Sequence, residues 1–315
     1  MKKSYELDMC NGPILGKILV FAIPLMISGI LQLLFNAADI IVVGRFTGSQ
    51  ALAAVGSTSA LINLIINLFI GVSVGANVVV ARNYGAKDYD GIHGAVHTSV
   101  LTAIWGGIIL IFVGILLARP MLEMMGTPED VINLSVLYMR IYFVGMPAFM
   151  MYNFGAAILR AIGDTKRPLY FLTLSGVVNV VLNLFFVIVF HMGVAGVALA
   201  TIISQAISAF LIILCLMKMD GPCHLDFKHL KFHPEQLKSM LRIGLPAGLQ
   251  GAIFSISNVL IQSSVNSFGS QVMAGNTAAG NIEGFVYNSM NAVYQTSLSF
   301  TSQNMGAKKF DRINK

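Results

Sequence analysis

Long unbroken runs of apolar residues leave this chain few folds to adopt. Of its 315 residues, 56% are hydrophobic and only 11% are charged, whereas soluble domains carry ~25% charged residues. A helix needs ~20 apolar residues to cross the ~30 Å hydrocarbon layer of a membrane. Eight runs are long enough: 18–43, 52–81, 95–118, 131–159, 169–190, 194–217, 241–267 and 272–303. We therefore expect an all-α polytopic membrane protein.

The chain also repeats itself at an offset of about 221 residues. The segment 85–90 (GAKDYD) reappears as 306–311 (GAKKFD), and 48–51 (GSQA) reappears as 269–272 (GSQV). A duplication of this length in an apolar chain is typical of transporters built from two copies of one helical bundle. Six spans return the chain to its starting side, so we expect the second copy to be parallel to the first and not inverted.

The repeat predicts the domain organisation. We expect a complete six-helix lobe over 1–218, a cytoplasmic linker over 219–239 that ends in a short surface helix near 234–237, and a partial second lobe over 240–315. Lys315 corresponds to position 94 of the first copy. We therefore expect this chain to hold only the first two helices of a second bundle, and we expect these two helices to pack poorly.

Basic residues are distributed unequally between the two sides of the predicted spans. Of the 20 Lys and Arg residues, 17 lie on the side of the N-terminus, Arg45 and Arg119 lie on the other, and Arg140 lies within a span. Positive residues accumulate on the cytoplasmic side of membrane proteins. We expect a cytoplasmic N-terminus in a bacterial plasma membrane. The net charge of +6 then reflects topology, and it does not indicate a nucleic-acid partner.

Sequence motifs of the common enzyme classes are missing from the chain. It contains no HExxH, no Walker loop with GK[ST] and no DDxxD pair, which are signatures of zinc-hydrolase, nucleotide-binding and prenyl-diphosphate chemistry. Its one GxSxG match, 71–75 (GVSVG), lies inside an apolar run and not at the turn between a strand and a helix that this hydrolase motif requires. We expect no enzymatic activity and no cofactor. Energy for transport would then come from an ion gradient, with Na⁺ or H⁺ as the coupling ion.

Asp39 and Glu283 are the only carboxylates within the predicted spans. A charge deep in a bilayer costs at least ~2.5–3.5 kcal/mol, so such residues usually have a function. Asp39 ends a polar stripe on one helical face that consists of Ser28, Gln32, Asn36 and Asp39. One alternative is that Asp39 reaches the outer surface or pairs with Arg45. A stripe of this kind, however, lines a water-filled cavity more naturally than it faces lipid.

Three further spans carry polar stripes. Their members are Ser175, Asn179 and Asn183 in the fifth span, Asn258, Gln262 and Asn266 in the seventh, and Asn281, Asn288 and Gln295 in the eighth, with Glu283 nearby on a different face. Any single Asn is more simply explained as a hydrogen-bonding contact between helices, worth ~0.6 kcal/mol on average. Several continuous stripes in one chain favour a shared cavity, and we predict that these residues line it.

Four segments resemble the multidrug and toxic compound extrusion (MATE) family. They are 39–45 (DIIVVGR), 160–168 (RAIGDTKRP), 193–201 (GVAGVALAT) and 303–308 (QNMGAK). The resemblance implies two six-helix lobes and the export of amphipathic, often cationic compounds in exchange for Na⁺ or H⁺. It also implies a first-lobe cation site at Asp39, Asn179, Asn183 and Thr201. Many members carry Asp where this chain has Asn183, which leaves Asp39 as the only carboxylate of that site.

Two other functions remain open on the sequence. One is a flippase of similar architecture for lipids or lipid-linked oligosaccharides, and the other is a membrane fragment that does not transport. A cavity rich in Arg and Lys would favour an anionic lipid-linked substrate, but the spans contain only Arg140 and, at the cytoplasmic edge of the seventh, Arg242. We therefore expect small amphipathic substrates and the lipid bilayer as partners, and a monomer for the full-length protein.

Overall fold

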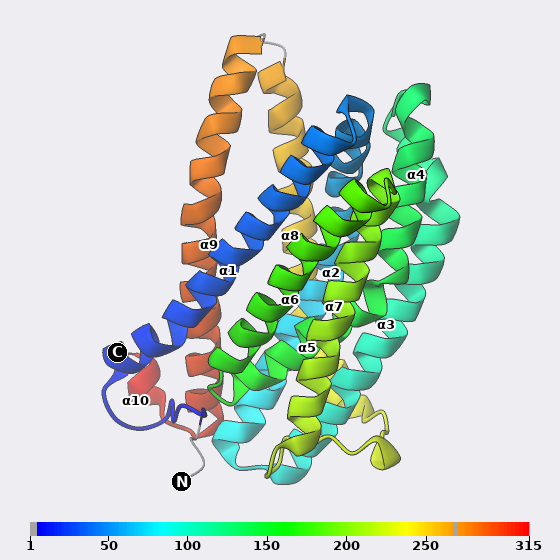
Figure 1. Ribbon diagram of the computed structural model, residues 1–315. Coiled ribbons are helices and arrows are strands. Elements are labelled where there is room, and N and C mark those ends of the chain that lie inside the picture. The colour runs from blue at the N-terminus through cyan, green and yellow to red at the C-terminus, as the bar shows by residue number, and fades with distance from the viewer. Residues whose placement is uncertain (1–4, 267–269, 315) are drawn as a thin grey trace.

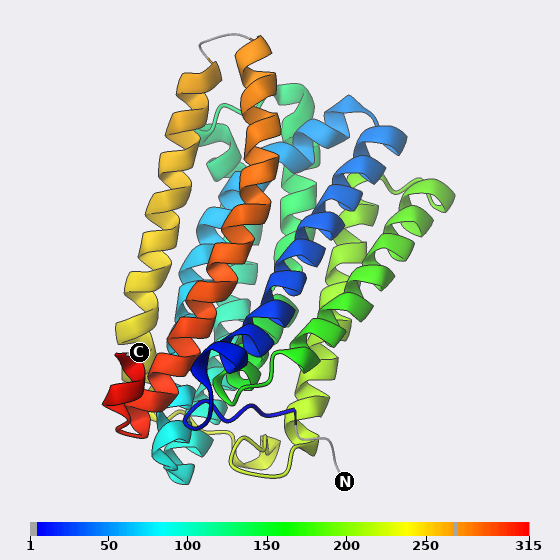
Figure 2. The same cartoon turned by 90° about the vertical axis from the view of Figure 1, so that its left-hand side faces the viewer.

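A computed structural model describes residues 5–266 and 270–314, with the side chains of 60, 259–260, 262–278 and 280–281 left out. The helices are α1 (Ile14–Phe46), α2 (Ser49–Ala86), α3 (Tyr89–Met124), α4 (Glu129–Val144), α5 (Met146–Ala161), α6 (Lys166–Leu184), η1 (Phe185–Val189), α7 (Gly193–Lys218), η2 (Phe227–His229), α8 (Pro234–Asn266), α9 (Ser270–Gly306) and α10 (Phe310–Ile313). The long helices run roughly side by side, and both termini lie at one end of the bundle (Figures 1 and 2).

Among the described residues, five helices are long and apolar enough to cross a membrane, or six if α4 and α5 count as one broken span. α8 and α9 are equally long but less apolar. The expected span over 131–159 consists of two helices, because α4 and α5 meet at Gly145 with a bend of 48°. Pro147 sits in the first turn of α5, where its missing N–H and its ring do not let α4 continue.

The core of the first six spans lies where α3, α4, α5 and α7 pack together. Its largest fully buried side chains include Phe143, Phe154, Leu110 and Met139. Glycines let the helices approach closely at these bulky residues: a Cβ built on Gly114 would overlap the ring of Phe143. The interior of this group of helices is therefore closely packed.

α8 packs along α2 over much of its length, seen in Figure 2 as neighbouring yellow and cyan helices. The contact is made by glycines four residues apart on each helix: Gly71 and Gly75 on α2, and Gly244 and Gly248 on α8. A Cβ on Gly248 would lie 2.5 Å from the carbonyl oxygen of Leu68. Such spacing lets two backbones touch in a membrane. The first half of α8 is therefore closely packed, contrary to the expectation for the seventh span, whereas the described side chains over 253–258 are mostly exposed.

The sequence repeat reappears as reciprocal contacts between the two copies. A Cβ built on Gly85 would overlap the carbonyl of Gln303, and a Cβ built on Gly306 would overlap the carbonyl of Arg82. Residue 306 is the repeat equivalent of 85, and 303 that of 82. The ends of α2 and α9 thus cross each other in equivalent ways, as a parallel duplication predicts.

The segment between α7 and α8 lies at the same end of the bundle as the termini (Figures 1 and 2). We expected a separate surface helix near 234–237. These residues instead form the first turn of α8, which begins at Pro234. Pro is favoured in a first helical turn because no N–H bond is required there. The irregular part of the linker therefore ends one residue before α8 begins.

Candidate functional site

Asp39 on α1 and Asn183 on α6 meet where these two helices pack together. The Asn183 amide donates a hydrogen bond to the Asp39 carboxylate, and it also donates to Asn179 Oδ1 at 3.2 Å. Asn179 donates to Thr201 Oγ1 on α7 at 3.5 Å. The structure therefore joins the four residues named for a first-lobe cation site into one hydrogen-bonded chain across three helices.

Close approach of α1 and α6 makes this contact feasible. A Cβ built on Gly176 would overlap the ring of Phe35, so only glycine lets the two helices come this near. Phe35 lies one helical turn before Asp39, and Asn179 and Asn183 follow Gly176 by three and seven residues on the same face. The glycine thus sets the distance between the carboxylate and its amide partner.

Burial makes the polar groups of this site costly to leave unsatisfied. Asn183 is fully buried and Asn179 is 6% exposed. Among the described residues, Asn183 Oδ1 has no hydrogen-bond partner. A buried oxygen without a donor is destabilising unless something else fills its place. The Asp39 carboxylate, this amide oxygen and the Thr201 hydroxyl are hard oxygen donors, the type that suits small hard cations.

A small cavity adjoins the site on the side of α7. It has a volume of about 10 Å³ and is lined by residues that include Tyr142, Thr201 and Gln205. This is about the minimum that one water molecule needs. The Thr201 hydroxyl donates to the carbonyl of Val197 at 3.0 Å and accepts from Asn179, which leaves one lone pair to accept a further hydrogen bond. One water or one ion could therefore reach the end of the chain of polar groups.

The helix geometry changes next to Asn183. α6 ends at Leu184 and continues as the π-helix η1 over Phe185–Val189. Phe185 and Phe190 make an edge-to-face ring contact, with centroids 5.0 Å apart. π-helical turns interrupt the regular backbone ladder and frequently occur at functional sites. Here the irregular turn follows directly after the amide that binds Asp39.

Two tyrosines of α4 belong to the surroundings of Asp39 and were missed in the sequence analysis. Tyr138 is buried and Tyr142 is partly buried, and Tyr142 lines the small cavity together with Thr201. Their rings are 5.9 Å apart. A pair of tyrosines four residues apart in the span that also carries Arg140 was the signal that could have identified them.

Other residues predicted for the cavity lie apart from this chain of hydrogen bonds. The Ser175 hydroxyl donates to the carbonyl of Leu172 in its own helix at 3.1 Å. Four further side chains are exposed: those of Gln32, Asn36, Asn258 and Glu283. Gln262, Asn266 and Asn281 have side chains outside those that the structure describes. The alternative in which Asp39 turns outward to Arg45 is not what the structure shows, because Asp39 binds Asn183.

Comparison with known proteins places this geometry in a family. "Probable multidrug resistance protein YoeA" of Bacillus subtilis (strain 168) is 31% identical over 301 residues, which are 93% of this chain and 65% of that protein. "Multidrug export protein MepA" of Staphylococcus aureus (strain NCTC 8325 / PS 47) is 24% identical over 264 residues, which are 84% of this chain and 58% of that protein. The chain thus spans about two thirds or less of these relatives.

Solved structures agree with the sequence comparison. The outward-facing conformation of a multidrug resistance MATE family transporter of the MOP superfamily matches with a TM-score of 0.92 and 26% identity, covering 100% of this chain and 70% of that one. The MatE family model matches residues 24–185, about half of the chain, and this range contains Asp39, Asn179 and Asn183. On this match, the chain belongs to the MatE family.

Proposed function

We propose that this chain forms the ion-binding lobe, and part of the partner lobe, of a secondary active antiporter that exports amphipathic, cationic compounds in exchange for Na⁺ or H⁺. The observation that carries the proposal is the buried chain of polar groups from Asp39 to Thr201. The names of the relatives YoeA and MepA, which describe multidrug resistance and export, support export of drug-like compounds.

Asp39 is the residue through which we propose that ion and substrate are coupled. Its carboxylate lies within a membrane helix and accepts a hydrogen bond from the neutral amide of Asn183. An isolated carboxylate in such a place requires a cation or a proton to balance its charge. A cationic substrate that enters the same lobe competes with that ion, so binding of one favours release of the other.

We expect Na⁺ to stabilise the chain against thermal unfolding if Na⁺ is the coupling ion. A ligand present at 100 times its dissociation constant stabilises the folded state by about 2.7 kcal/mol. The measurement is the unfolding temperature of the detergent-solubilised chain in NaCl against choline chloride. Asp39→Asn is expected to abolish the Na⁺ response. If acidification, and not Na⁺, stabilises the wild type through Asp39, the proton is the ion. Equal responses of wild type and Asp39→Asn would refute an ion site at this residue.

We also propose that the end of the bundle that carries the termini lies in the cytoplasm of a bacterial cell. Gln50 and Asp90 are both exposed. Gln50 lies in the first turn of α2, and Asp90 lies in the first turn of α3, which follows the other end of α2. A membrane-impermeant thiol reagent added to intact cells is expected to label Gln50→Cys and to leave Asp90→Cys unlabelled until the cells are opened. The reverse pattern would invert the topology.

A further inference from the structure

Two segments of the chain have equivalent places in the repeat, because each directly precedes the first helix of a copy. Residues 5–12 precede α1, and residues 226–233 precede α8. Both lie at the end of the bundle that carries the termini (Figures 1 and 2). Each segment binds the copy to which it does not belong, and we call these contacts the first and the second clasp.

The first clasp holds residues 5–12 on the end of α9 and on α10. Asn304 Nδ2 donates to the carbonyl of Met9 at 3.2 Å. Lys309 Nζ donates to the carbonyl of Cys10 at 3.0 Å, and Arg312 donates to the carbonyl of Gly12 at 3.0 Å. The Met9 side chain is fully buried in a small apolar cluster that includes Phe21 of α1 and Phe300 of α9. This clasp therefore combines charged donors with an apolar anchor.

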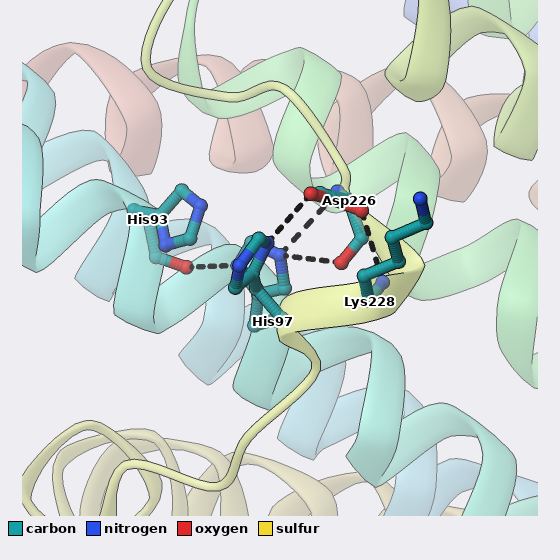
Figure 3. A network of polar contacts seen from close by, with 5 residues as sticks. His93, His97, Asp226 and Lys228 are labelled. Atoms are coloured by element: carbon teal, nitrogen blue, oxygen red, sulfur yellow. Dashed lines mark hydrogen bonds and ion pairs between the residues drawn. The ribbon is translucent and has the colours of Figure 1, made fainter.

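The second clasp holds residues 226–233 on the beginning of α3 (Figure 3). His97 is fully buried, and its Nε2 lies 3.2 Å from the carbonyl of Asp226. The backbone N–H of His233 donates to Thr98 Oγ1 at 3.1 Å. Asn83 at the end of α2 donates to the side chain of Gln236 in the first turn of α8 at 3.4 Å. The linker is thus attached to the first copy on both sides of the turn between α2 and α3.

The two clasps use equivalent residues of the repeat. Asn83 and Asn304 are 221 positions apart. Asn83 binds Gln236 in the first turn of α8, and Asn304 binds the carbonyl of Met9 just before α1. Each asparagine is followed by a turn with a left-handed lysine, Lys87 with φ 57° and Lys308 with φ 56°. Between the clasps, the ends of α2 and α9 cross at Gly85 and Gly306.

We propose that the two clasps form a matched lock on this end of the interface between the copies, so that they open and close together. Asn83 and Asn304 are the positioning residues that keep both clasps closed. The crossing glycines leave no space for the helix ends to slide, so separation of the copies at this end must open both clasps. The lock itself does not depend on the proposed transport function. Only the meaning of the open state, which would be access from the cytoplasm, rests on that proposal.

Native Cys10 reports on the lock because it lies within the first clasp. Its Sγ is 4.0 Å from the side-chain oxygen of Gln303, and the residue is partly buried. Burial also raises the pKa of the Cys10 thiol, and the thiol reacts more slowly than the thiolate.

In the whole chain in liposomes, Asn304→Ala is expected to raise the rate of maleimide labelling at Cys10 about tenfold, the order expected when a buried hydrogen bond is lost. Lys308→Ala, which alters an exposed neighbour, is expected to leave the rate unchanged.

The decisive variant is Asn83→Ala, which removes a contact of the second clasp only. If the two clasps open together, Asn83→Ala is expected to raise the rate of maleimide labelling at Cys10 in the first clasp. The control variant Lys87→Ala is expected to leave that rate unchanged. Labelling of Cys215 on α7 serves as the integrity control. Faster Cys10 labelling in Asn83→Ala with unchanged Cys215 labelling supports the lock. Unchanged Cys10 labelling in Asn83→Ala, or equal acceleration at Cys215, overturns it. If the chain shows no Na⁺ or proton response at Asp39 but Asn83→Ala still accelerates the labelling of Cys10, the proposed function is contradicted and the lock stands.

Discussion

Asp39→Asn is expected to reduce ion-driven efflux by the protein to background while leaving the chain folded. The substitution keeps the size of the side chain and removes its charge, so no anionic ligand remains in the chain of groups from Asn183 to Thr201. Because a charge within a membrane costs at least ~2.5–3.5 kcal/mol, its loss is expected to preserve or raise thermal stability. The measurement is efflux of a cationic dye under imposed Na⁺ and H⁺ gradients, together with the unfolding temperature.

Glu283→Gln is the matched control, because Glu283 is the other carboxylate within the predicted spans and its side chain is exposed on α9. Neutralising it is expected to leave most of the efflux intact. Two results would contradict the role of Asp39: efflux at the wild-type level in Asp39→Asn, or equal losses in both variants. Reduced efflux accompanied by a lower unfolding temperature would assign Asp39 a structural role instead.

Much of the architecture could be predicted from local patterns. Apolar runs identified every long helix because the bilayer imposes a fixed length on each span, and the offset of 221 residues anticipated the reciprocal crossing of Gly85 and Gly306. The spacing of four residues put Asn179 and Asn183 on one face of α6, where they are hydrogen-bonded to each other. Regular periodicity is enough for such features, since each depends on neighbours along one helix.

Features that depend on distant contacts could not be read in the same way. Met9 is buried through contacts with residues about 290 positions away, and nothing in its own segment distinguishes it from an exposed methionine. The break at Gly145 had a local signal in Pro147, which the continuous hydrophobicity of the run concealed. The close packing of α2 and α8 also had a signal, the G-x-x-x-G pattern at 71–75 and 244–248, whose partner helices the sequence did not specify.

Gly71→Ala is expected to separate α2 from α8 and to destabilise the chain by about 1–3 kcal/mol, the usual cost of overpacking. A Cβ at this position would overlap the backbone of Gly248. The obstacle is main chain and not the end of a flexible side chain, so it can yield only if one helix moves as a whole. The unfolding temperature of the solubilised chain measures the loss.

Gly56→Ala on the same helix provides the control for helix propensity. A Cβ on Gly56 meets nothing within 4 Å, and Ala is favoured over Gly in helices by roughly 0.5–1 kcal/mol. This variant is therefore expected to be as stable as wild type or more so. If Gly71→Ala lowers the unfolding temperature and Gly56→Ala does not, contact between α2 and α8, and not the intrinsic helix stability of α2, causes the loss of stability in Gly71→Ala. Similar shifts in both variants would mean that α8 does not need close contact with α2, and that the two copies associate through other residues.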